Sequence, residues 1–173
     1  MFFNDTMMRK LITLMMFAIC SMLQMKAQTI VTISGDGKKY EVLDLTGKDK
    51  IQWGGNEQIG LPAKSEKNGE LNTKAIVTAV GRNNGFDGRA YAAKVCDSIQ
   101  INGMDDWYLP AKDEAAIIYL NIKTFGWADD HMTLWTSTEA SGTQAVSLYT
   151  YDGSWWNVAK VDSYNMVCIR KVE

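Results

Sequence analysis

The fold class of this chain is decided by residues 134–172, which read LWTSTEASGTQAVSLYTYDGSWWNVAKVDSYNMVCIRKV. Apolar, β-branched and aromatic residues alternate or cluster there in four short runs, which is typical of β-strands. The four runs are residues 134–138, 145–151, 154–161 and 165–172. Asp152-Gly153 lies between the second and third runs and predicts a tight hairpin. We therefore expect a C-terminal β-meander.

Upstream of this β-rich end, the sequence predicts two main helices. Residues 89–99 place apolar side chains at helical spacing, so one face of that helix is expected to be buried. This face consists of Tyr91, Ala92, Val95, Cys96 and Ile99. The second helix is predicted at residues 112–122, where Asp113 and Glu114 in the first turn suit the helix dipole. For Glu114 this favours a structural carboxylate over a buried acid with chemistry.

The N-terminal half is predicted from strand and cap signals. Residues 29–45 are expected to form a β-hairpin, and residues 53–71 are expected to be loop because they lack periodicity. Asn72 or Thr73 is predicted to cap a short helix at residues 74–80. The order of strands, two main helices and a β-meander indicates an α+β fold.

The start of the chain is typical of a secretory signal peptide. Residues 7–23 are almost unbroken apolar sequence behind two basic residues, and the stretch turns polar before Ala27. We expect residues 1–27 to be this leader and residues 28–173 to form one domain. The apolar stretch is too short for a membrane anchor, so no membrane insertion is expected after its removal. Cys20 is interpreted as part of the leader, because the residue before it does not suit a lipidation signal.

Charge and cysteine content narrow the partners and the compartment. The leader holds three of the 18 Lys and Arg residues and one of the 20 Asp and Glu residues, so the remaining chain has a formal charge of −4. No basic block survives, which argues against nucleic acid as a partner. Cys96 and Cys168 are the two cysteines left in an exported chain, and they predict one disulfide worth about 4 kcal/mol. The alternative is a pair of unpaired buried thiols.

Signals for catalysis and for metal binding are sparse. His131 is the single histidine and follows Asp129 and Asp130 in a predicted loop, without a nucleophile motif beside it. We expect a solvated loop there rather than a metal site. A metal-assisted enzyme that uses Asp129, His131 and Glu139 remains the alternative, but no cofactor is predicted.

A second acidic pair has a similar choice of interpretations. Asp105-Asp106 offers hard oxygen ligands for calcium, or it forms a turn in which the carboxylates satisfy local backbone groups. The turn is the preferred interpretation.

The aromatic C-terminal third carries the candidate binding site. Flat rings beside Asp and Asn side chains suit a sugar or a protein surface, although the same rings can also fill a β core. Strand alternation sends Trp155 and Trp156 to opposite faces, which predicts one in the core and one exposed. The candidate ligand-binding residues are Tyr149, Tyr151, Asp152, Trp155, Asn157, Asp162, Tyr164 and Asn165.

Four segments, in order, resemble motifs of bacterial C-type lectin-like domains. Along the chain they are the helical YAAKVC at residues 91–96, WYLPAKDE at 107–114, LWTSTE at 134–139 and VCIR at 167–170. Their order is similar to that of the Lcl C-terminal domain family, whose namesake is a collagen-like surface adhesin. The resemblance implies a C-type lectin-like fold, in which two helices flank a twisted antiparallel sheet and the termini pair. It also implies that Cys96 and Cys168 tie the first helix to the last strand.

Departures from related families limit what the resemblance implies about activity. Trp156-Asn157-Val158 lacks the acid of a calcium motif, so calcium-dependent sugar binding is not expected. The formylglycine-generating enzymes of similar fold use two C-terminal cysteines, and this chain has only Cys168 there. The stretch 149–165 also suits the variable protein of a diversity-generating retroelement.

The leading hypothesis is an exported, non-catalytic binding module, similar to an adhesin or lectin, that recognises a glycan or a surface protein. The final compartment is periplasmic, cell-surface or extracellular. Besides the enzyme and the retroelement protein, a structural subunit of a surface assembly is an alternative. In that case the hairpin at residues 29–45 offers an edge for strand addition. The sequence leaves the oligomeric state open.

Overall fold

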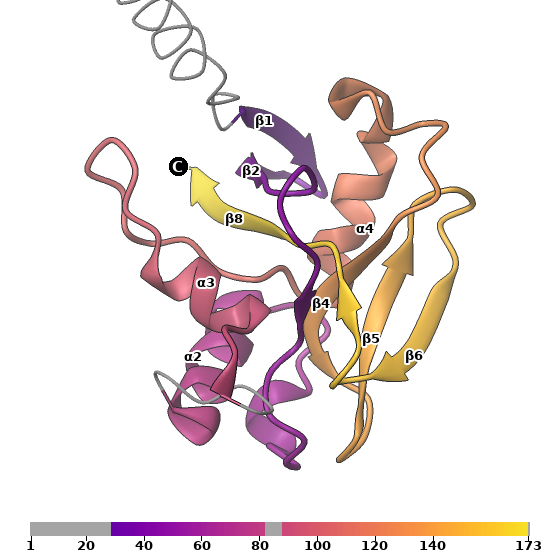
Figure 1. The fold of residues 1–173 in the computed structure, drawn as a ribbon. Helices are drawn as coiled ribbons and strands as arrows, with labels where there is room; N and C mark the ends of the chain where they lie inside the picture. Colours follow the sequence, from indigo (N-terminus) through magenta and orange to yellow (C-terminus); the bar gives the residue numbers. More distant parts are fainter. Residues whose placement is uncertain (1–28, 82–87, 173) are drawn as a thin grey trace, which may run out of the picture.

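The fold is described from a computed structural model, in which residues 29–81 and 88–172 are placed well enough to describe (Figure 1). The predicted signal peptide at residues 1–27, together with Cys20, lies outside the described residues. Across the described ranges, no helix combines the length and the apolar character that crossing a membrane requires.

The described part of the chain is an α+β fold with antiparallel sheets, as the order of predicted elements indicated. One sheet joins β1 (Ile30–Gly35), β2 (Lys38–Asp44) and β8 (Val167–Val172). A second pairs β3 (Ile51–Gln52) with β7 (Ser163–Tyr164). A third consists of β4 (Thr133–Glu139), β5 (Gln144–Tyr149) and β6 (Trp155–Ala159).

The predicted C-terminal meander is right for three strands and wrong for the fourth. β4, β5 and β6 follow one another in the sheet, whereas β8, which lies within the run predicted at residues 165–172, leaves it. β8 pairs with β2 instead, with Leu43 opposite Cys168. In Figure 1, β8 runs beside the β1–β2 hairpin, so the two ends of the domain lie together. The pairing buries Val167, Cys168 and Ile169, an apolar run that identifies a strand but not its neighbour.

The described chain has three α-helices, where the sequence predicted two main helices and a short one at residues 74–80. They are α2 (Gly69–Val80), α3 (Ala92–Ser98) and α4 (Lys112–Leu120), and short 3-10 turns lie at η1 (Leu61–Ala63) and η3 (Ile122–Phe125). Figure 1 shows α2 and α3 on one side of the molecule and α4 on the other, beside the β4–β5–β6 sheet. α3 begins later than the predicted helix at 89–99, because Tyr91 is still extended.

The start of α2 was predicted wrongly. The helix begins at Gly69, and Asn68 is its cap, since the Asn68 side chain accepts a hydrogen bond of 3.0 Å from the backbone N–H three residues later. Asn72 and Thr73 are buried inside the helix. Asn72 Nδ2 donates to the backbone oxygen of Ser65 over 2.7 Å, and Thr73 Oγ1 accepts from the backbone nitrogen of Leu109 over 3.0 Å. Both residues therefore fasten α2 to its neighbours.

The predicted disulfide is present between Cys96 and Cys168, whose Cα atoms lie 5.4 Å apart. It links α3 to β8, and both cysteines are fully buried. Around it lies a core cluster between α2, α3 and the sheets, with Trp53, Tyr91 and Trp135 among its largest members. A second cluster lies under α4 and comprises residues such as Tyr108, Ile118, Leu134, Leu148 and Ile169.

Glu114 joins the starts of α2 and α4 from inside the molecule. Its Oε2 accepts from the backbone nitrogens of Gly69 and Ala111, both at 2.9 Å, and its Oε1 accepts from the Tyr108 hydroxyl at 3.1 Å. A Cβ atom on Gly69 would lie 2.5 Å from Glu114 Oε2 and from the Leu109 carbonyl oxygen, so only glycine fits. Burial raises the pKa of Glu114, and the hydrogen bonds it accepts oppose that rise. The carboxylate thus has the structural role expected of it.

Candidate functional site

Four rings gather where β5 turns into β6, and we call them the aromatic patch. They are His131, Tyr149, Tyr151 and Trp156. His131 stacks on Tyr151 with ring centroids 4.2 Å apart, and Tyr149 stacks on Trp156 at 5.1 Å. A contact of 2.8 Å between His131 Nδ1 and Tyr149 Oη joins the two stacked pairs. The four rings therefore form one continuous surface.

Two members of the patch are largely open to solvent. Tyr151 is 56% exposed and Trp156 is 50% exposed. Rings of this size gain free energy from being covered, and most proteins bury them. Their exposure side by side is what distinguishes this region as a candidate binding surface.

Short polar contacts hold the segments that carry the patch. Thr150 Oγ1 donates to the Asp130 carbonyl over 2.7 Å and accepts from the Met132 backbone nitrogen over 3.0 Å. Thr150 lies between the two tyrosines of the patch in sequence, and it therefore fixes the loop that carries His131 next to them. In the turn, Asp152 Oδ1 accepts from the backbone nitrogen of Ser154 over 2.9 Å. A hydrogen bond with the Ser154 side chain, followed by this backbone contact, lowers the pKa of the Asp152 carboxyl. The patch is thus built on a braced hairpin.

Gly153 completes that turn for two reasons. Its φ of 76° lies in the left-handed region, which favours glycine. A Cβ atom there would also lie 2.5 Å from the Tyr119 ring of α4, so the turn packs directly on the helix.

Trp155 lies on the opposite face of β6 from Trp156. The register places Trp156 beside Ser147 and Trp155 beside Leu148, so the alternation predicted from the sequence is observed. The expectation that one ring would be in the core is wrong, because Trp155 is still 36% exposed. β6 is an edge strand of its sheet and is covered from one side only. The Lys112 ammonium of α4 lies 5.8 Å from the Trp155 ring centroid, within cation–π range.

The eight predicted site residues do not form one group. Tyr149 and Tyr151 belong to the aromatic patch, Asp152 shapes its turn, and Asn157 is exposed on β6. Trp155 lies on the opposite face of β6 from the patch. The remaining three residues lie in or next to β7: Asp162 is exposed, Tyr164 is half-buried and Asn165 is buried.

Tyr164 and Asn165 are held by the fold. Tyr164 is half-buried with its ring edge-on to Trp135 at 5.1 Å, and burial, followed by the nearby Asp162 carboxylate, raises its pKa. Asn165 is only 7% exposed, and its backbone pairs with Thr133 and Trp135. A solvent-facing role for Asn165 is therefore not available.

Sequence reasoning missed His131 and Trp156 as members of the site. For His131 the sequence predicts a solvated loop, with a metal site as the alternative because of the adjacent acids, and neither interpretation includes stacking with other rings. Trp156 follows Trp155 directly, and the alternation signal said only that the two rings diverge. The position of β6 at a sheet edge explains why Trp156 is exposed, but which strand lies at the edge is a property of the topology and not of the local sequence.

The residues of the alternative metal-assisted enzyme do not converge. Glu139 is buried and forms an ion pair of 2.6 Å with Lys160, and its two oxygens also accept from the backbone nitrogens of Ile59 and Gly60. His131 is exposed in the aromatic patch. No group of three His, Cys, Asp or Glu side chains in the described ranges is placed to hold a metal ion.

The acidic pair at Asp105-Asp106 has a partner that the sequence did not suggest. Asp106 Oδ1 accepts from Arg170 Nε over 2.6 Å, and Arg170 Nη1 donates to Glu41 Oε2 over 2.9 Å. The hydrogen bond from Arg170 lowers the pKa of Asp106. Asp106 thus belongs to an ion-pair chain across β2 and β8 rather than to a local turn network.

Comparison with protein-family models and with curated proteins found no match to this chain.

Proposed function

We propose that this protein is an exported, non-catalytic binding module with a C-type lectin-like fold, and that the aromatic patch contacts its ligand. The observation that carries the proposal is the exposure of Tyr151 and Trp156 in one stacked surface. A ring platform of this kind loses little conformational entropy when a ligand covers it, because the stacks and the turn already hold it.

The C-type lectin-like assignment rests on the motifs and on two features of the architecture. The Cys96–Cys168 bridge links a helix to the last strand, and β2 pairs with β8 so that the ends of the domain meet. Both features are what the resemblance implies for such a fold. The export proposal rests on the leader-like residues 1–27 and on the disulfide, which persists in oxidising compartments.

A carbohydrate is the ligand class that suits the patch best. The C–H faces of a sugar ring stack on flat aromatic rings, and the polar tips of His131 and Tyr151 supply directional hydrogen bonds at the rim. Calcium has no role in this proposal, because the patch offers no cluster of carboxylates. Binding is therefore expected to survive chelation.

A protein ligand is the second candidate, and the position of β6 favours it. An edge strand offers its outer backbone groups to an added strand, and Trp155 and Trp156 present rings on both of its faces. Such a ligand would contact Trp155 and Lys112 as well as the aromatic patch, whereas a sugar on the patch would leave Trp155 untouched.

A glycan array with the purified, oxidised protein tests the proposal. The array is run with wild type, with Tyr151→Ala/Trp156→Ala, with Trp155→Ala, and with Leu61→Ala as a control that also removes an exposed apolar side chain. We expect saturable binding that persists in EDTA, falls about tenfold or more in the double variant, and is unchanged in the control. Binding that the double variant retains would refute the site, and a silent array would refute the carbohydrate assignment.

A further inference from the structure

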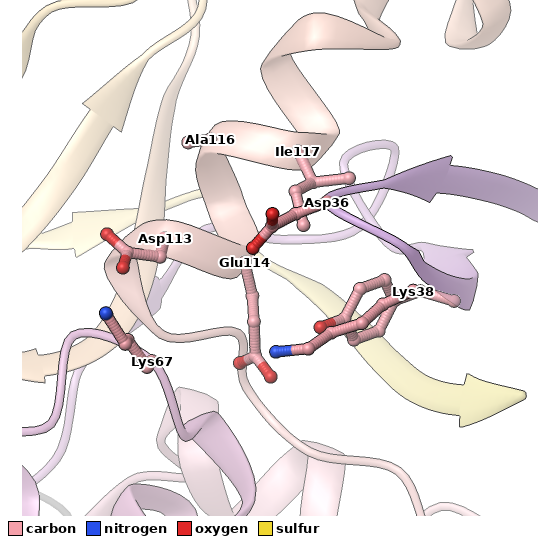
Figure 2. Close-up of a pocket in the computed structure, with 8 residues that line it drawn as sticks. Asp36, Lys38, Lys67, Asp113, Glu114, Ala116 and Ile117 are labelled. Atoms are coloured by element: carbon pink, nitrogen blue, oxygen red, sulfur yellow. The ribbon is translucent and has the colours of Figure 1, made fainter.

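A cavity of about 350 Å³ opens between the turn of the β1–β2 hairpin, the first turns of α4 and the segment before α2 (Figure 2). Its lining shares no residue with the aromatic patch. Volumes of this size accommodate small molecules. The cavity is therefore a separate candidate for ligand binding.

Tyr40 supplies a buried donor that has no partner. The residue is 1% exposed, it lines the cavity, and its hydroxyl makes no hydrogen bond within the described chain. Burial, with the neighbouring Glu114 and Asp36 carboxylates, raises the pKa of Tyr40 to about 12. The hydroxyl thus stays protonated near neutral pH, and leaving such a donor unsatisfied costs free energy. A ligand with an acceptor atom would remove that cost.

Charged side chains of both signs surround this donor. Lys38 lies two residues before Tyr40 on the same face of β2, and Asp36 precedes it in the turn. Figure 2 shows Lys67 and Asp113 directed toward each other on one side of the cavity, and Asp36, Glu114 and Lys38 on the other.

The four exposed charged side chains at the rim of the cavity form no ion pair within the described chain. The side chains of Asp36, Lys38, Lys67 and Asp113 line the cavity without a salt bridge to one another or to other described residues. The lining holds three carboxyl groups (Asp36, Asp113 and Glu114) and two ammonium groups (Lys38 and Lys67), so groups of both charges adjoin in the cavity. This pattern disfavours a simple anion or a simple cation, each of which would meet like charges.

We propose that this cavity binds a free α-amino acid as its zwitterion. An α-amino acid carries a carboxylate and an ammonium on the same carbon, which matches a lining whose opposite charges adjoin. The carboxylate accepts from Tyr40 Oη and Lys38 Nζ, and the ammonium donates to the Asp36 carboxylate. Ala116 and Ile117 of α4 form the apolar part of the lining and suit a small aliphatic side chain. A sugar would leave charges of both signs without a counter-charge.

Titration calorimetry with L-alanine and L-valine tests this inference. N-acetyl-L-alanine lacks the ammonium, L-alaninamide lacks the carboxylate, and glucose lacks both, so each serves as a matched probe. We expect saturable binding of the two amino acids and at least about tenfold weaker binding of the three other probes. Absence of binding by either amino acid at millimolar concentration, or equal binding of glucose, would overturn it.

Tyr40→Phe tests the role of the orphaned hydroxyl. The change removes one oxygen and keeps the ring, so the free energy of unfolding is expected to stay the same or rise, while amino-acid affinity falls about tenfold. Asp36→Asn is expected to weaken amino-acid binding by a similar factor, and it changes an exposed turn residue and not a core residue. Tyr151→Phe, in the aromatic patch, is the control and leaves amino-acid binding unchanged. Wild-type affinity in both Tyr40→Phe and Asp36→Asn would show that the cavity does not bind in this way.

Discussion

The two ends of strand β6 invert the usual distribution of polar and apolar residues. At its start, Trp156 is half exposed, and one residue past its end the side chain of Lys160 is completely buried. Both lie in the same polar-aromatic stretch of sequence. At one end the polar group makes all its interactions inside the protein, whereas at the other end the aromatic ring is free to contact a ligand.

Lys160 uses every hydrogen of its ammonium group inside the protein. Nζ donates to Glu139 Oε1 over 2.6 Å, to the Glu57 carbonyl over 2.7 Å and to the Gly142 carbonyl over 2.9 Å. It also lies 4.6 Å from the ring centroid of Trp53. A buried charge with a complete set of partners has no capacity for a ligand. The exposed rings of the aromatic patch have no comparable explanation from folding.

Breaking the buried pair should have the largest effect on stability. In Lys160→Met, Glu139 is left as a buried carboxylate without its cation, and we expect the free energy of unfolding to fall by about 3–5 kcal/mol. Chemical denaturation of the oxidised protein measures this loss. Glycan and amino-acid binding are expected to persist wherever the variant remains folded.

Replacing both partners is the control for that prediction. In Lys160→Met/Glu139→Gln no unpaired charge remains, and the Gln amide oxygen can still accept from the backbone nitrogen of Ile59 or Gly60, so part of the lost stability should return. A single variant as stable as wild type would show that the pair is not part of the folded core. The comparison between the two ends of β6 would then fail at its buried end.

Glu114 provides a smaller test, through pH. Because burial raises its pKa above the ordinary value of 4.5, the folded protein holds this proton at pH values where the unfolded chain has released it. Folding therefore takes up a proton, and the contribution of Glu114 to stability increases as pH falls through the folded pKa toward 4.5. It is constant below that value. Glu114→Gln preserves the shape and removes this increase.

The measurement is the difference in free energy of unfolding between wild type and Glu114→Gln as a function of pH. Taking the difference cancels the contributions of carboxyls that both proteins share, such as Asp106, whose lowered pKa makes the protein less stable in acid. We expect the difference to shift in favour of wild type on acidification. A flat difference would mean that Glu114 is not desolvated in the way that its burial indicates.

The sequence predicted what depends on local pattern. The α+β order, the N-terminal and β5–β6 hairpins and the Cys96–Cys168 pairing follow from periodicity, turn residues and the cysteine count. The pairing of β8 with β2 depends on contacts more than a hundred residues apart, which no local pattern records. The Lys160–Glu139 pair joins two residues 21 positions apart for the same kind of reason.

The sequence predicted which region carries the candidate site better than it predicted which residues of that region belong to the site. Aromatic density in the C-terminal third correctly directed attention to Tyr149 and Tyr151, which lie in the aromatic patch. Tyr164 and Asn165 share that density, but Tyr164 lies in β7 opposite β3 and Asn165 pairs with Leu134 of β4, so neighbouring strands cover them in part or fully. Exposure depends on which strand lies at the edge, and that is decided by the assembled sheet.

The smallest stability effect should come from the exposed end of β6. Trp156→Ala removes a half-exposed ring and its stack on Tyr149, so the free energy of unfolding should fall by less than about 1 kcal/mol. Thermal and chemical denaturation measure this beside Lys160→Met. A loss above about 3 kcal/mol would mean that Trp156 stabilises the fold. Its exposure would then no longer be evidence for a ligand-binding surface. A small loss combined with lost glycan binding assigns the ring to recognition, because the fold then stands without it.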